Sequence, residues 1–223
     1  EYMGAGIDPQ VRSLVEQALC VLEAQGATLQ EVSLPNTDAA LSTYYIIAPA
    51  ECSSNLARYD GVRFGLRVDR PSLTDTYLRT RDEGFGAEVK RRVMLGTYAL
   101  SSGYYDAYYR KAQQVRTVIA REFASVFQSV DALVAPTSPT VAFTMGDRDD
   151  PLSMYMCDVV TLPVNLAGLP GISVPCGFSD GLPVGLQVIA PRFEDARVFR
   201  VAAAYEGATS WHTQQSPFAG VGT

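Results

Sequence analysis

Two apolar runs separated by a Ser-Asp-Gly turn constrain the fold more than any other feature of this chain. The runs are ISVPCGF (172–178) and LPVGLQVIA (182–190). A glycine-containing turn between two strand-like runs predicts a β-hairpin, because such tight turns need residues that tolerate positive φ. The shorter runs DALVAP (131–136), which ends at a proline, and ATLQEVSL (27–34), which alternates, also read as strands.

Helical patterns separate these strands. Asp8 before Pro9 is a helix start, and Gly26 stops that helix. Periodicity and breakers predict further helices at 38–58 with a bend near Pro49, 72–81, 86–100, 103–126 and 194–206, with a polar linker at 60–75. Alternating helices and strands predict an α/β fold.

The predicted helix 103–126 carries an apolar stripe that includes two tyrosines. Its members are Tyr105, Tyr108, Ala112, Val115, Ile119 and Phe123. We expect a core stripe whose tyrosine hydroxyls reach the rim, and a tyrosine binding platform is the alternative.

Composition narrows the classes of function. The 223 residues are 47% hydrophobic and 19% charged, which is typical of a globular domain. The net charge of -6 argues against broad binding to nucleic acid or to membrane surfaces. Four cysteines without a CxxC pair and a single histidine, His212, predict no metal site and free, mostly buried thiols in a reducing compartment. We expect no transmembrane helix and no signal peptide.

No familiar catalytic motif stands out. The chain has no G-x-S-x-G elbow, phosphate loop or HExxH motif, and His212 sits near the C-terminus, which gives a Ser-His-Asp triad little support. Two charged residues stand in unusual settings instead.

Asp158 is the only charged residue between Pro151 and Ser179. A carboxylate buried in such an apolar segment must be paired, hydrogen-bonded or neutralised. It is expected either to clamp the turn before VNLAGLP as an N-cap or to meet a cationic group of a ligand. Arg92, at the end of EVKRR, is expected either to bind a ligand carboxylate or to form a surface or interhelical salt bridge.

Longer stretches resemble a known family. NLARYDGVRFG, EGFGAEVKRRVMLGTYALSSGYYDAYYRKAQQVR, APTSPTVAF, DPLSMYMCD and VNLAGLPGISVPCGFSDGLPVGLQVIA are similar to the amidase signature family. Within that family they resemble the A subunits of aspartyl/glutamyl-tRNA amidotransferases, nearly continuously from about residue 1 to 212. The stretch that ends in GYYDAYY is specific to this branch.

The resemblance implies a fold and an activity. The family fold is a mixed β-sheet between layers of helices, and residues 1–223 would be the C-terminal portion of one such domain, with 213–223 a loose tail. The implied chemistry is glutamine hydrolysis by a serine, a cis-serine and a lysine. The ammonia released amidates Glu-tRNA(Gln) or Asp-tRNA(Asn) on a partner B subunit, where ATP and Mg are expected, and a C subunit completes a cytoplasmic heterotrimer.

One departure from the family pattern limits this chain. The catalytic lysine and the glycine/serine-rich signature with both serines fall upstream of Glu1, so we expect no catalytic residue here and no glutaminase activity from this chain alone.

The resemblance also assigns a substrate site. Alignment of motifs places glutamine-binding residues at Tyr44 in LSTYYIIAPAE, Arg92 in EVKRRV and Asp158 in MYMCDVV. Arg92 would bind the α-carboxylate, Asp158 the α-ammonium, and Tyr44 would add a hydroxyl hydrogen bond. Tyr45 and Arg91 are the neighbouring alternatives. A stand-alone amidase of the same family and a non-catalytic binding module are the other functions considered.

Overall fold

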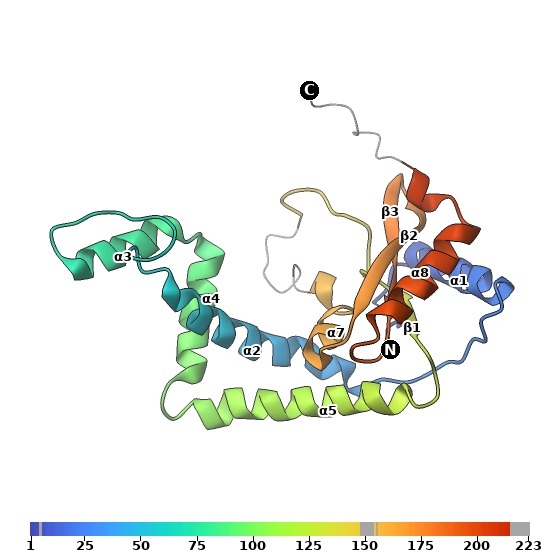
Figure 1. Ribbon diagram of the computed structural model, residues 1–223, viewed down its shortest axis with the longest axis horizontal. Coiled ribbons are helices and arrows are strands. Elements are labelled where there is room, and N and C mark those ends of the chain that lie inside the picture. The colour runs from blue at the N-terminus through green and yellow to red at the C-terminus, as the bar shows by residue number, and fades with distance from the viewer. Residues whose placement is uncertain (5, 148–153, 155, 215–223) are drawn as a thin grey trace. The chain divides into compact units, whose positions relative to one another are not determined.

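A computed structural model shows the arrangement of the chain (Figure 1) and describes residues 1–4, 6–147, 154 and 156–214. The chain forms two units, one of Glu1–Leu41 with Thr117–Thr223 and the other of Ser42–Arg116. We call them the sheet unit and the helical unit. The tail predicted at 213–223 lies outside the described residues from 215 onward.

The predicted hairpin is confirmed and forms most of the sheet. Strand β2 (Gly171–Ser179) pairs antiparallel with β3 (Leu182–Ile189), and β3 pairs antiparallel with β1 (Leu133–Pro136). The turn residues Asp180 and Gly181 have φ of 51° and 77°, the conformation that an Asp-Gly pair tolerates. The α/β fold class is confirmed, and the three described strands lie in the order β1-β3-β2.

Two helices pack against this sheet and close its core. Helix α1 (Pro9–Ala24) and helix α8 (Asp195–Ala208) contact each other and strands β2 and β3 (Figure 1). Alternate residues of β3 point to one side of the sheet, and Val184, Leu186 and Val188 are buried. As predicted, Asp8 caps α1, because its carboxylate accepts hydrogen bonds from two backbone N–H groups of the first turn.

The strand predicted at 27–34 is wrong. These residues have no regular secondary structure, and in this segment only Leu34 is buried. The Glu1 carboxylate accepts hydrogen bonds from the Ser33 hydroxyl, at 2.6 Å, and from the Leu34 N–H, at 2.7 Å. A side chain therefore satisfies a backbone group that a sheet ladder would otherwise use.

The remaining short elements of the sheet unit lie between its longer ones. They are the 3₁₀ turns η1 (Pro35–Ala39), η4 (Met156–Asp158) and η5 (Trp211–Thr213), and helix α7 (Leu162–Ala167). Gly168 ends α7 with φ of 69°, a left-handed cap that favours glycine.

The helical unit confirms the helices predicted for it. Its elements are α2 (Ala40–Asn55) with Pro49 inside, the 3₁₀ turn η2 (Leu56–Arg58), α3 (Leu73–Gly84), α4 (Ala87–Leu100) and the π-helical turn η3 (Tyr105–Arg110), which continues into α5 (Lys111–Val126). Helices α2 and α4 meet backbone to backbone, because a Cβ on Gly96 would lie only 1.8 Å from the carbonyl oxygen of Pro49.

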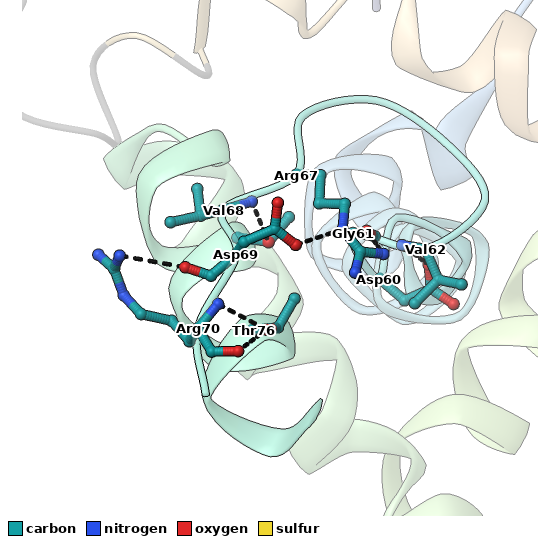
Figure 2. A network of polar contacts seen from close by, with 9 residues as sticks. Asp60, Gly61, Val62, Arg67, Val68, Asp69, Arg70 and Thr76 are labelled. Atoms are coloured by element: carbon teal, nitrogen blue, oxygen red, sulfur yellow. Dashed lines mark hydrogen bonds and ion pairs between the residues drawn. The ribbon is translucent and has the colours of Figure 1, made fainter. Parts of the chain in front are cut away.

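Threonines of α3 hold the loop that precedes this helix (Figure 2). The Thr80 hydroxyl oxygen accepts from the Val68 N–H at 3.0 Å, and the Thr76 hydroxyl oxygen accepts from the Arg70 N–H at 3.0 Å. Both threonines are buried. The polar linker predicted at 60–75 is therefore a loop with specific hydrogen bonds to the helix that follows it.

Two expectations about side-chain burial are wrong. Tyr105 and Tyr108 are 46% and 44% exposed, so the buried stripe begins only at Ala112 and continues through Ile119 and Phe123. The four cysteines are free, but Cys176 alone among them is buried, and Cys20 is exposed. Periodicity gives the direction of a helix face, whereas burial depends on what packs against it. Among the described residues, no helix combines the length and the apolar character needed to cross a membrane.

Candidate functional site

The structure brings the side chains of Tyr44 and Arg92 together within the helical unit. Tyr44 lies in α2 and Arg92 in α4. Arg92 Nη1 donates a hydrogen bond of 2.9 Å to the phenolic oxygen of Tyr44. The guanidinium carbon also lies 5.9 Å from the centre of the Tyr44 ring. Because the phenol accepts this bond, its own proton can still be donated to another acceptor.

A carboxylate one helical turn earlier completes this arrangement. Glu88 Oε1 accepts from Arg92 Nε at 2.9 Å, in an ion pair spaced four residues apart on α4. The hydrogen bond to Glu88 raises the pKa of the Arg92 guanidinium above its ordinary value; partial burial opposes this effect and the Tyr44 hydrogen bond adds to it. Arg92 is therefore a permanent cation with two named partners. Residue-by-residue inspection of the sequence missed Glu88, although its spacing to Arg92 is a recognisable helix signal.

The neighbouring arginine lies in a different environment. Arg91 is 52% exposed and its Nη1 donates to Glu88 Oε2 at 2.6 Å, whereas the Arg92 side chain is 30% exposed and also contacts α2. The Tyr45 ring packs edge-on against the Tyr44 ring, with centroids 5.9 Å apart. The geometry thus favours Arg92 and Tyr44 over Arg91 and Tyr45 as a pair that acts together.

Asp158 belongs to the sheet unit and is described there by itself. Its side chain is exposed, so the burial expected from its apolar neighbours in the sequence is wrong. The N-cap of α7 is Thr161, and it is the backbone carbonyl of Asp158 that accepts from the Thr161 N–H at 2.9 Å and from its hydroxyl at 3.0 Å. The backbone, not the carboxylate, therefore organises this turn. The carboxylate is left on the surface of the described unit.

The sheet unit also has a hollow lined by hydroxyl groups, which sequence inspection missed. The hollow has a volume of ≈ 300 Å³, and Cys157, next to Asp158, is part of its wall. The Thr137 and Ser173 hydroxyls in this wall are hydrogen-bonded at 2.6 Å. Gly185 lies beneath them, and a Cβ there would come within 2.5 Å of the Ser173 hydroxyl oxygen and 2.7 Å of the Thr137 one. The described residues that line the hollow carry no charge, so it suits a small neutral polar group.

A second hollow adjoins the first. It has a volume of ≈ 370 Å³ and shares Thr140 and Cys157 with the hollow above. Tyr2 and Thr37 line it and are both more than nine-tenths buried. Burial raises the pKa of the Tyr2 hydroxyl, which keeps this phenol neutral. Among the described residues, no cluster of three or more His, Cys, Asp or Glu side chains could hold a metal ion.

Comparisons with known proteins agree with the geometry. The chain is 59% identical over 96% of its length to the A subunit of glutamyl-tRNA(Gln) amidotransferase from Geobacillus thermodenitrificans, and 59% identical over 98% to its counterpart from Chloroflexus aggregans. It covers 45% of the length of each of these relatives. The solved structure of the same protein from Thermotoga maritima, 44% identical, superimposes with a TM-score of 0.69 over 92% of this chain and 40% of that one.

The match to a family model covers nearly all of the described chain. The model described as Amidase matches residues 1–199, which include both the Tyr44–Arg92 pair and Asp158. The fold and the family thus agree with the resemblance that the motifs carry, and the chain belongs to the amidase family.

Proposed function

We propose that this chain supplies the glutamine-binding side of the glutaminase subunit of a tRNA-dependent amidotransferase. The observation that carries the proposal is the contact between Tyr44 and Arg92, the two residues that motif alignment selects from separate helices. The 59% identity to the A subunits of glutamyl-tRNA(Gln) amidotransferases supports the choice of this branch of the family.

The proposed contacts match the two charged ends of the amino acid. The Arg92 guanidinium binds the α-carboxylate of glutamine, and the Tyr44 hydroxyl donates to the same group. The exposed Asp158 carboxylate binds the α-ammonium. Each charge-assisted hydrogen bond contributes roughly 1.5–3 kcal/mol. Both ends are needed to select a free amino acid, since a simple aliphatic amide has neither.

The reaction itself needs groups from the rest of the protein. The serine, cis-serine and lysine of the family lie outside residues 1–223, so we expect no hydrolysis by this chain alone. In the proposed enzyme, ammonia released from glutamine amidates Glu-tRNA(Gln) or Asp-tRNA(Asn) on a B subunit that uses ATP and Mg. The pair is joined by a C subunit, in the cytoplasm, and residues 1–223 form the C-terminal portion of a single amidase signature domain.

The test compares variants in the full-length protein, assembled with its partners. Arg92→Ala and Asp158→Asn are expected to raise the KM for glutamine by at least about tenfold, the equivalent of about 1.4 kcal/mol. The expected change in kcat is small, because neither residue contacts the reacting amide. Arg91→Ala is the matched control and should leave KM within about twofold. An unchanged KM in Arg92→Ala, or a preference for aliphatic amides over glutamine, would refute the proposal.

A further inference from the structure

Glu88 contacts two arginines with one carboxylate. Its Oε1 accepts from Arg92 Nε at 2.9 Å and its Oε2 from Arg91 Nη1 at 2.6 Å. Glu88 stands in the first turn of α4, where the helix dipole stabilises an anion. The carboxylate is therefore held in place by its position on the helix as well as by its two cations.

The two contacts of Arg92 lie on different nitrogens of its guanidinium. Glu88 takes the hydrogen of Nε, and Tyr44 takes one of Nη1. A guanidinium is planar, so two hydrogen bonds at separate nitrogens set both the direction of the side chain and the plane of its fork. An arginine without such contacts loses about 2 kcal/mol of rotamer freedom when it is fixed by a ligand.

We infer that Glu88 is a positioning residue, which orients the Arg92 guanidinium for the carboxylate of the amino-acid substrate. The inference rests on the proposed function, since it takes the ligand of Arg92 to be that carboxylate. Glu88 acts through Arg92: pre-orienting the fork means that less freedom is lost when the ligand binds.

Charge and positioning predict opposite results for Glu88, which makes the two roles separable. Glu88 is an anion close to the proposed position of another anion, so by charge alone its removal would tighten binding and lower KM. By positioning, its removal loosens Arg92 and raises KM. Glu88→Gln keeps a carbonyl oxygen that can accept from Arg92 Nε, and therefore retains part of the positioning without the charge.

The experiment measures steady-state glutaminase kinetics of the full-length protein with its partners. Glu88→Ala is expected to raise the KM for glutamine about tenfold, with kcat within about twofold, and Glu88→Gln is expected to restore at least half of the loss on a logarithmic scale. With 4-aminobutanamide, which is glutamine without its α-carboxylate, Glu88→Ala should change KM by less than about twofold. Arg91→Ala serves as the control for the other ion pair of Glu88.

The outcomes separate this inference from the proposed function. If Arg92→Ala leaves the glutamine KM unchanged, the proposed site fails and the role of Glu88 fails with it. If Arg92→Ala raises KM but Glu88→Ala leaves or lowers it, Glu88 does not position Arg92. A fall in kcat and in urea midpoint with unchanged KM, for both Glu88 variants, would assign Glu88 to the stability of α4 and also overturn the inference.

Discussion

Gly96→Ala tests the helix crossing on which the Tyr44–Arg92 contact depends. A Cβ at position 96 would lie 1.8 Å from the carbonyl oxygen of Pro49, 2.4 Å from its carbonyl carbon and 2.8 Å from the nitrogen of Ala50. All three neighbours are backbone atoms, so no side chain can rotate away. Positions 92, 96 and 99 share one face of α4, and Arg92 therefore lies on the face that meets α2.

The sign of the effect follows from two opposing contributions. Carbon and oxygen normally approach to about 3.3 Å, so the two helices would have to separate by about 1.5 Å at this point. Overpacking of this kind typically costs about 1–3 kcal/mol. Replacing glycine by alanine inside a helix stabilises by about 1 kcal/mol where there is room. The collision exceeds that gain, and we expect a net loss of about 1–2 kcal/mol in the free energy of unfolding.

Urea denaturation of the full-length protein, followed by helical circular dichroism, measures this loss. Gly84→Ala is the matched control in the same unit, because a Cβ there meets only Leu66, at an ordinary 3.6 Å from its Cδ2. The same Gly96→Ala protein should show a raised KM for glutamine, since separating α2 from α4 lengthens the 2.9 Å contact between Tyr44 and Arg92. If Gly96→Ala is as stable as Gly84→Ala, the reasoning about the crossing is refuted.

The other predictions concern the stability and association of the chain. Burial raises the pKa of the Cys176 thiol to about 11; the unfolded thiol ionises first, so stability is full below its ordinary pKa and falls, by about 2–3 kcal/mol in total, as the pH rises to about 11. Urea midpoints at pH 8 and 10.5 should show a steeper loss for the wild type than for Cys176→Ala, and equal slopes would contradict this. Asp8→Ala should lower the free energy of unfolding by about 1 kcal/mol, because it removes the cap of α1, and Asp8→Asn should restore most of it. Thr80→Val removes the acceptor of the Val68 N–H and should speed proteolysis between residues 59 and 71, whereas Thr97→Val, on an exposed threonine of α4, should not. Expressed alone, the chain should associate, because Leu73, Met94 and Phe193 expose 72%, 73% and 81% of their surface; a monodisperse monomer would contradict this.

Local signals in the sequence predicted most of the secondary structure. The hairpin follows from Asp180 and Gly181, which accept the positive φ of a tight turn, and α1 follows from Asp8 before Pro9. These features involve neighbours in the chain, so their physics is visible in a short window. The segment 27–34 has the alternation of a strand but no strand partner among the described residues, and pairing is what makes a strand.

Burial was the property that the sequence could not supply. Asp158 is surrounded by apolar residues in the chain and is nevertheless exposed, and Tyr105 and Tyr108 continue an apolar stripe beyond the point where it is covered. Apolar neighbours in sequence say which residues can be buried. Only the packing of distant segments determines which residues are.

The sequence by itself determined the family, the local elements and the identity of the residues proposed to bind glutamine. The tertiary structure alone decided which of them act together: Tyr44 and Arg92 are 48 residues apart in the chain and meet at 2.9 Å. The physical reason is the close approach of α2 and α4 at Pro49 and Gly96, which a glycine permits but does not by itself predict. Within that contact, Glu88 became recognisable as a partner of Arg92 only when both its oxygens could be assigned to donors.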